Sequence, residues 1–171
     1  MNPLNPTVLS IGIFKSGTRF NIIPSKAYLE GTTRCFSMEI NEIFEGKIRR
    51  IVENTAKAYN AEAELNYRQL SLPTINDEKL SEYASKVAVD LVGEEGNVIF
   101  EKTTGGEDFS FFSTKAKTEF VFVGTRNDEK VNYYPHHHSY FDIDESALTT
   151  AAGLYAGFAI EYLKGENSLL S

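Results

Sequence analysis

Residues 26–36, KAYLEGTTRCF, decide how the first part of the chain folds, because two kinds of side chain alternate along them. Successive side chains of a β-strand point to opposite faces of a sheet. One face would carry Ala27, Leu29, Gly31 and Thr33, and the other Tyr28, Glu30, Thr32 and Arg34. The alternation therefore predicts a strand with one buried and one solvated face.

A second strand is predicted just upstream. Residues 7–14 are apolar and rich in β-branched side chains, and residues 16–18, Ser-Gly-Thr, supply a turn. Pro24 would lie where no ladder hydrogen bond is needed. We expect the two strands to form an antiparallel hairpin with a wide connection.

The hairpin is followed by a helical pattern. Between residues 39 and 59 the apolar side chains recur on one stripe and the charged ones face away. Residues 61–68 alternate again, which gives the order β-β-α-β. These are the last four elements of a ferredoxin-like layer, whose first strand lies between the third and the fourth. Because unpaired buried backbone is costly, we expect this chain to be the carboxyl-terminal part of a longer protein, or another chain to complete the sheet.

A boundary follows at residues 72–74, Leu-Pro-Thr, and the rest of the chain is typical of an α/β sheet domain. The first expected element is a helix capped by Asn76 or Asp77 and ended by Gly93. It is followed by a strand at 97–100, a polar loop at 105–110 and an apolar strand at 119–124. A loop that holds the histidines at 136–138 then leads into a last helix, capped by Asp142 or Asp144 and ended by Gly165. In open α/β sheets, ligands gather beyond the carboxyl ends of the strands, where both loops would meet. The predicted domains are 1–72 and 73–171.

Composition and charge narrow the range of partners. The 171 residues are 42% hydrophobic and 24% charged, and the formal net charge is -7. An acidic surface argues against nucleic acid and anionic membranes as partners, and no apolar run is long enough to cross a bilayer. The single cysteine, Cys35, excludes an internal disulfide. We expect a cytoplasmic protein in which Cys35 is a small buried residue.

All three histidines of the chain are consecutive, at positions 136–138. Neighbouring side chains of an extended segment alternate, so at most two of them can face one site. Neutral imidazole is the commonest protein ligand for divalent transition metals. The cluster predicts one metal ligand, and the alternative is a solvated polar loop.

Four motifs, in this order, resemble the amidohydrolase branch of metallopeptidase family twenty, which comprises aminoacylases, carboxypeptidases and hydrolases of indole-acetic-acid and hippurate conjugates. They are Gly17-x-x-x-Asn21-x-Ile-Pro24, Gly31-Thr32-x-Arg34, Gly105-Gly106-Glu107-Asp108-Phe109-Ser110 and His137-x-x-x-Phe141-Asp142-x-Asp144-Glu145. The resemblance covers nearly the whole chain. It implies an incomplete ferredoxin-like lid, which also makes the dimer contact, followed by the carboxyl-terminal part of a zinc-peptidase-like α/β catalytic domain.

The resemblance also implies roles for individual residues. His137, four residues before the aromatic, matches a metal ligand. Asn21 matches an amide donor near the substrate carbonyl, and Arg34 a guanidinium fork on the substrate carboxylate. Gly105 and Gly106 match a loop that lines the cleft. Glu107, in the same loop, would hold a ligand histidine or contact the substrate.

Structural roles are the alternatives for several of these residues. Asn21 would close the turn before Pro24, and Arg34 would pair with Glu30 or with an acid on the helix. Asp108 would cap a short helix that begins after it. Ser139 departs from the family, since many relatives carry proline there, which is a mild change in loop stiffness.

No catalytic residue is expected in this chain. The family's early His-x-Asp motif, its general-base glutamate and its remaining metal ligands belong upstream, and one histidine cannot hold two metals. We expect the parent protein to be a metal-dependent amidohydrolase that cleaves N-acyl amino acids or small peptides, as a homodimer, with two zinc ions or with manganese or cobalt. The chain alone would be inactive. The alternative is a non-catalytic, truncated relative that serves as a dimerisation or assembly module.

Overall fold

The computed structural model of the chain describes residues 4–129 and 134–167. The chain packs as two compact units, one of Met1–Ile75 with Thr103–Lys115 and one of Asn76–Lys102 with Ala116–Ser171. The sequence groups residues 103–115 with the second domain, whereas they pack in the first unit. There the Ser110 hydroxyl accepts a hydrogen bond of 2.9 Å from the backbone N–H of Leu72.

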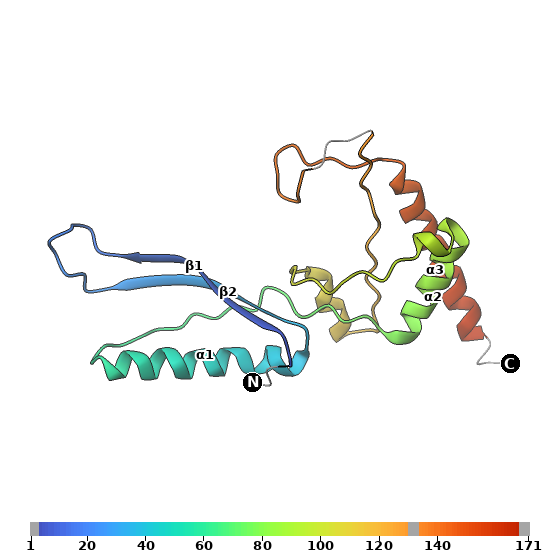
Figure 1. Ribbon diagram of the computed structural model, residues 1–171. Coiled ribbons are helices and arrows are strands. Elements are labelled where there is room, and N and C mark those ends of the chain that lie inside the picture. Colours follow the sequence, from blue (N-terminus) through green and yellow to red (C-terminus); the bar gives the residue numbers. More distant parts are fainter. Residues whose placement is uncertain (1–3, 130–133, 168–171) are drawn as a thin grey trace. The chain divides into compact units, whose positions relative to one another are not determined.

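The predicted hairpin is confirmed in the first unit. Strands β1 (Thr7–Ser16) and β2 (Ala27–Cys35) pair antiparallel, with a bulge between Ile11 and Ile13 (Figure 1). Gly31 is required in β2, because a side chain there would collide with the backbone carbonyl of Ser10 on β1. Cys35, at the end of β2, is half-buried rather than buried, and burial raises the pKa of its thiol.

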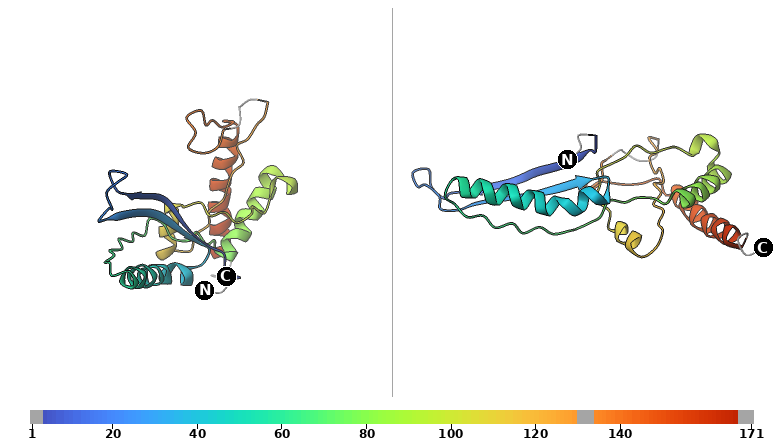
Figure 2. Two further views of the ribbon diagram at one scale, coloured as in Figure 1. Left: turned by 60° about the vertical axis from the view of Figure 1, so that its left-hand side comes forward. Right: turned by 90° about the horizontal axis from the view of Figure 1, so that it is seen from below.

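The predicted helix at 39–59 is also confirmed, as α1 (Met38–Ala58). It begins where the Ser37 hydroxyl accepts a hydrogen bond of 3.3 Å from the N–H of Ile40, and it lies along the hairpin (Figure 2). Ile40 and Phe44 are its buried residues.

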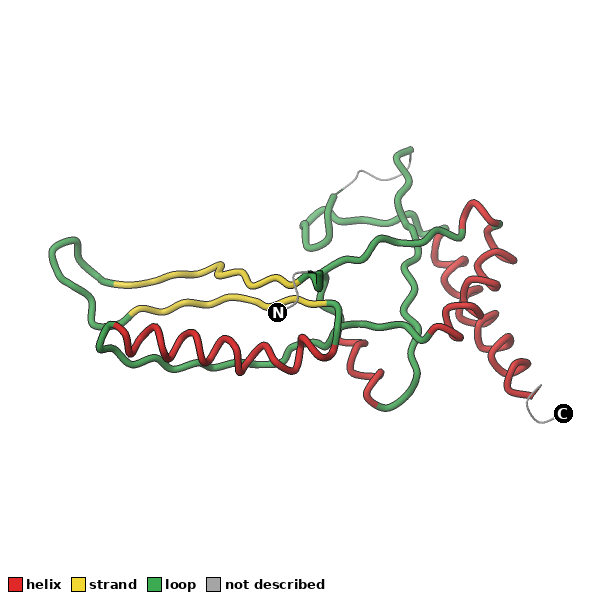
Figure 3. Tube along the Cα trace, turned by 60° about the horizontal axis from the view of Figure 1, so that its bottom comes forward, coloured by secondary structure: helices red, strands yellow, loops and turns green. Residues whose placement is uncertain are grey.

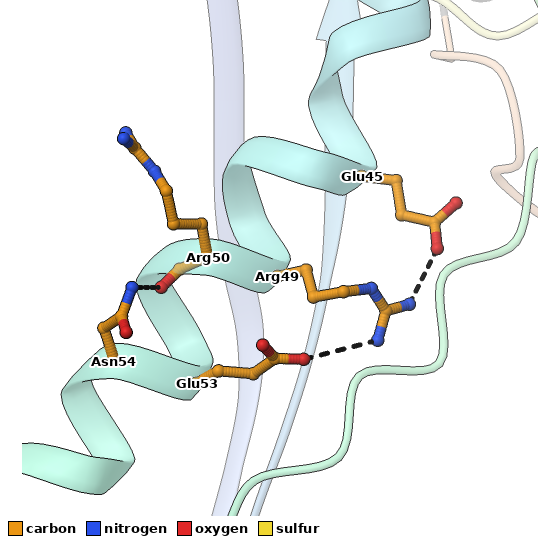
Figure 4. A network of polar contacts seen from close by, with 5 residues as sticks. All are labelled: Glu45, Arg49, Arg50, Glu53 and Asn54. Atoms are coloured by element: carbon orange, nitrogen blue, oxygen red, sulfur yellow. Dashed lines mark hydrogen bonds and ion pairs between the residues drawn. The ribbon is translucent and has the colours of Figure 1, made fainter.

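The exposed face of α1 carries charge pairs spaced one turn apart. Arg49 lies 2.7 Å from the Glu45 carboxylate and 3.8 Å from that of Glu53, and the Asn54 amide donates to the Arg50 carbonyl (Figure 4). Pairs at this spacing each stabilise a helix by about 0.2–0.5 kcal/mol.

The expected strand at 61–68 is wrong, because the sheet of the described chain has two strands only. These residues form an extended loop that runs along α1 (Figure 3). Side chains hold it there: the hydroxyls of Thr33 and Tyr67 are 2.8 Å apart, and the amides of Asn41 and Gln69 exchange hydrogen bonds of 3.3 and 3.0 Å. Alternating polar and apolar side chains indicate that the two faces of an extended segment differ in polarity. A β-strand also needs a neighbouring backbone with which to form hydrogen bonds.

The second unit is built on two packed helices, α2 (Glu78–Val92) and α3 (Ala147–Asn167). Asp77 caps α2, accepting from the Leu80 N–H at 3.2 Å, and Gly93 ends it with φ 77°. Before α3, the Asp144 carboxylate accepts from the Ser146 N–H at 3.1 Å, within the turn that precedes the first helical residue, Ala147. The helix continues past the predicted end at Gly165.

The expected strands at 97–100 and 119–124 are also wrong, since neither segment has a ladder partner in the described chain. Their aromatic rings touch, with the Phe100 and Phe122 centroids 4.7 Å apart. The Asn76 side chain replaces a strand neighbour, accepting from the Phe120 N–H at 2.9 Å and donating to its carbonyl at 3.0 Å. The observed architecture is therefore mixed α/β with a two-stranded sheet.

The remaining elements are short 3₁₀ helices, η1 (Glu94–Gly96) in the second unit and η2 (Asp108–Thr114) in the first. Within residues 4–129 and 134–167, no helix has the length and apolar character needed to span a membrane.

Candidate functional site

The loop that precedes α3 engages two of the three histidines. The His138 ring stacks on Tyr134, with centroids 4.5 Å apart and planes at 11°, and its Nδ1 accepts from the Tyr140 N–H at 3.1 Å. The His136 ring meets Phe141 edge-on at 4.9 Å. Both flanking imidazoles therefore already have partners within the loop.

His137 differs from its neighbours in backbone and in side chain. Its φ is 69°, in the left-handed region, which costs a residue with a side chain about 1–2 kcal/mol. Its exposed ring makes no hydrogen bond, ion pair or ring contact with any described residue. Residues held in this region often mark functional sites.

His137 is suited to supply one ligand of a metal site. The imidazole is accessible and has no partner among the described residues, which suits a ligand for a divalent transition metal. Among the described residues, no group of three or more His, Cys, Asp or Glu side chains is arranged to hold a metal ion. The described chain therefore offers a single ligand and not a complete centre.

Two of the other predicted site residues meet in the first unit. The first carbon of any side chain on Gly106 would lie 2.5 Å from Nη1 of Arg34 and 3.3 Å from Oγ of Ser71. Arg34 is half-buried, and no described carboxylate lies within ion-pair distance of it. Glu30, its expected structural partner, accepts instead from the Tyr28 hydroxyl at 2.6 Å. The predicted structural alternative for Arg34 is therefore wrong.

The loop that carries Gly105 and Gly106 is anchored by its own continuation into η2. The Glu107 carboxylate accepts from the Phe109 N–H at 3.2 Å, so Glu107 takes the capping role predicted for Asp108. Ser110 is 1% exposed, and its hydroxyl donates to the Glu107 carbonyl at 2.6 Å.

Sequence reasoning missed both serines near this loop, Ser71 and Ser110. Neither lies in a periodic pattern, and the available signal for Ser110 was its place at the end of the glycine motif. No sequence pattern indicates Ser71, since its position beside Arg34 and Gly106 depends on the path of residues 69–72 past the glycine loop.

Asn21 lies in the connection between β1 and β2. The turn there is closed by backbone, with the Ile22 N–H donating to the Arg19 carbonyl at 3.4 Å, and the Asn21 amide has no hydrogen bond to a described side chain. The predicted turn-closing role is therefore not observed. Ala27 and Arg34 are seven residue steps apart in β2, which corresponds to about 23 Å, and Asn21 belongs to the connection that enters β2 at its Ala27 end.

His137 lies in the second unit, and the other predicted site residues lie in the first. Arg34, Gly106 and its neighbours in the glycine loop come together, while Asn21 is at the opposite end of the hairpin. One small molecule cannot touch Asn21 and Arg34 of the same chain.

Comparisons with known proteins assign the family. The sequence profile described as peptidase family M20/M25/M40 matches residues 4–161. The chain belongs to this family. Thermostable carboxypeptidase 2 of Saccharolobus solfataricus is 34% identical over 165 residues, covering 95% of this chain and 41% of that protein. Hippurate hydrolase of Campylobacter jejuni is 33% identical over 165 residues, covering 96% and 42%.

A solved structure of an M20 relative has a similar fold. The YXEP protein of Bacillus subtilis, described as a dinuclear metal binding peptidase from the M20 family, matches with a TM-score of 0.79 and 33% identity, over 92% of this chain and 42% of that one. The M20 chain described here thus spans about two fifths of the length of these relatives.

Proposed function

We propose that this M20 chain is part of a metal-dependent amidohydrolase that cleaves the amide bond of N-acyl amino acids or small peptides. The observation that carries the proposal is the imidazole of His137, which has no partner among the described residues and is held at φ 69° between two histidines that have partners. The family supports it, as do relatives named carboxypeptidase and hippurate hydrolase.

His137 would supply one ligand to a pair of divalent ions, zinc first, with manganese or cobalt as alternatives. Such a pair, when bound, would supply Lewis-acid chemistry, polarising the scissile carbonyl and lowering the pKa of a water molecule. The general base and the other ligands would come from residues outside this chain. The stacked and edge-on contacts of His138 and His136 would fix the direction in which the loop presents His137.

Arg34 would bind the free carboxylate of the substrate. A guanidinium presents a planar fork of donors that matches a carboxylate, and Arg34 has no described carboxylate of its own. The glycine loop beside it, including Gly105 and Glu107, would line the same part of the site. The relative named hippurate hydrolase supports this choice of substrate class.

Asn21 would serve the substrate of a second copy. It lies more than about 20 Å from Arg34 along the hairpin, so the two cannot share a small substrate within one chain. A homodimer formed through the hairpin unit would bring Asn21 of one protomer to the site of the other. We place this enzyme in the cytoplasm, as a single cysteine suggests.

The alternative is a non-catalytic module that pairs with another chain. The observation that favours it is the two-stranded sheet beside the extended residues 61–68, which have no backbone partner in the described chain. In that case another polypeptide would supply the missing strand, and no metal would be bound.

The deciding experiment measures bound metal and the hydrolysis of N-acyl amino acids by the complete protein. That protein includes this chain together with the regions that its relatives have outside the matched part. His137→Ala should lose at least one metal equivalent and about 100-fold or more in rate, since even indirect partners of a metal site are worth 10- to 100-fold. His136→Ala, which removes only the edge-on contact with Phe141, should keep the metal and lose less rate than His137→Ala. A His137→Ala protein with full metal and rate would contradict the ligand role, and a wild type without metal or hydrolysis would favour the assembly module.

A further inference from the structure

The loop that carries His137 is closed at its base by hydrogen bonds between residues far apart in the sequence. The Asp144 N–H donates to the Thr125 carbonyl at 3.0 Å, and the Asn127 side-chain amide donates to the Asp144 carboxylate at 2.6 Å. Thr125, Asn127 and Asp144 are all half-buried. These three residues, the loop anchor, hold the two ends of the loop together, as in compact surface loops whose ends lie close.

The side chains of Asn127 and Asp144 each bind on both sides. The Asn127 carbonyl oxygen accepts from the Glu129 N–H at 3.1 Å, and the second Asp144 carboxylate oxygen accepts from the Ser146 N–H at 3.1 Å. The backbone carbonyl of Asp144 accepts from the N–H of Ala147, the first residue of α3, at 3.0 Å. The loop anchor therefore connects the start of the loop to the start of α3. Its central bond, to a half-buried charged carboxylate, is stronger than a bond between neutral groups.

The segment between His137 and the loop anchor is held by backbone turns. The His138 N–H donates to the Pro135 carbonyl at 3.1 Å, and the Phe141 N–H donates to the His138 carbonyl at 3.0 Å. His137 lies within the first of these turns at φ 69°, and a residue stays in that region only where its surroundings hold it there. A shift of Asp144 would therefore be passed along this segment to the His137 ring.

We propose that Asn127 and Asp144 are positioning residues for His137, and that their mutual hydrogen bond sets where the imidazole lies and how tightly it holds a metal ion. The inference rests on the proposed function, in which His137 is a metal ligand. Groups that orient a ligand typically contribute 10- to 100-fold to metal affinity, although they do not touch the metal. Asn127 and Asp144 would act in this way, through the backbone of the loop rather than through the imidazole itself.

An asparagine and an aspartate that share one hydrogen bond allow an exchange of donor and acceptor. Asn127→Asp alone would place two carboxylates together, and like charges at hydrogen-bond distance repel. Asn127→Asp combined with Asp144→Asn would restore the bond in the opposite direction, with the net charge of the wild type. The new aspartate would still accept from the Glu129 N–H, and the oxygen of the new asparagine would still accept from the Ser146 N–H.

The test measures the zinc dissociation constant of the complete protein by competition with a chelator. Asn127→Asp should weaken zinc binding about tenfold or more, and the exchange variant should return to within about threefold of the wild type. Asp128→Asn is the matched control in the same loop. It removes an exposed ion pair with Arg126, which contributes little, so its zinc affinity should stay within about twofold of the wild type. Circular dichroism of the metal-free variants checks that each is folded.

A second background separates positioning of His137 from a general structural role. In His137→Ala the ring is gone, so adding Asn127→Asp should change zinc affinity by no more than about twofold. A merely structural role would instead weaken zinc binding by the same factor in both backgrounds. That result would overturn the proposal, as would an exchange variant that binds zinc no better than Asn127→Asp.

The outcomes also distinguish this proposal from the proposed function. Zinc lost in His137→Ala but kept in Asn127→Asp would overturn the positioning role and leave the ligand role intact. Unchanged zinc affinity in His137→Ala would overturn both. A wild type that binds zinc without hydrolysing N-acyl amino acids would contradict the proposed activity, and the zinc affinities of the variants would still decide the role of Asn127 and Asp144.

Discussion

Asp77 and Glu119 lie together at the start of α2, and their surroundings shift their pKa values in opposite directions. A hydrogen bond from Lys117, at 2.9 Å, lowers the pKa of Asp77. Burial raises the pKa of Glu119, although the Ser81 hydroxyl donates to it at 2.7 Å and partly offsets the effect. Lys117 thus favours the charged form of Asp77, whereas burial disfavours the charged form of Glu119.

We expect Glu119→Gln to stabilise the second unit increasingly as the pH rises. A carboxyl group whose pKa is raised on folding stabilises the protein when protonated, and this contribution is lost as the pH rises from the unfolded value through the folded one. Asp77 has the opposite sign, since its contribution is present above its unfolded pKa and is lost in acid. Urea unfolding of wild type and variant from about pH 4 to pH 7 would measure the difference.

Glu82→Gln, an exposed change on the same helix, controls for the loss of one negative charge. A gap between Glu119→Gln and wild type that stays constant with pH would contradict the role of burial at Glu119.

At the scale of elements, the packing of α2 against α3 depends on glycines that face larger side chains. A methyl group on Gly157 would lie 2.5 Å from Val87 Cγ1, and one on Gly153 would lie 3.3 Å from Leu91. Val87 is buried and β-branched, so it cannot turn away easily. Tyr83 and Tyr162 continue the contact, with ring centroids 6.3 Å apart.

Gly157→Ala is expected to destabilise the protein, and Gly46→Ala to stabilise it. Overpacking costs about 1–3 kcal/mol, which exceeds the gain in helix propensity of up to about 1 kcal/mol. Gly46 is an exposed residue of α1 with nothing within 4 Å of an added methyl group, so only the propensity gain remains there. Urea unfolding followed by circular dichroism would measure both, and two changes of the same sign would refute the packing argument.

At the scale of the whole molecule, the chain exposes more surface than a compact protein of its mass would. The chain exposes 14060 Å². A compact protein of its 19.2 kDa would expose about 8,400 Å², and two separate compact halves about 10,000 Å². Ile99 is 97% exposed and Tyr155 83% exposed, although each lies in an apolar pattern that predicts burial. Further polypeptide is expected to cover these surfaces.

The chain alone should therefore bind the dye ANS strongly and associate as its concentration rises, because water disfavours large exposed apolar patches. The complete protein should bind much less dye per mole. Dye fluorescence and size-exclusion chromatography would measure the two effects. Weak dye binding by a monomeric chain at high concentration would show that its surfaces are covered without other polypeptide.

By itself the sequence determined the elements whose hydrogen bonds are local. The bounds of α1, the cap at Asp77 and the end of α2 at Gly93 follow from periodicity and capping, and the hairpin follows from an apolar, β-branched run and the alternating run after it. Motif spacing also selected Arg34, Gly106 and His137 for attention, although their roles remain proposals.

The tertiary structure alone decided what depends on neighbours distant in sequence. The runs at 61–68, 97–100 and 119–124 have the composition of strands, yet each lacks the backbone partner that a strand requires. The tertiary structure also decided that Ser71 and Arg34 lie beside Gly106. A contact between segments far apart in the chain produces no periodic pattern in the sequence of either segment.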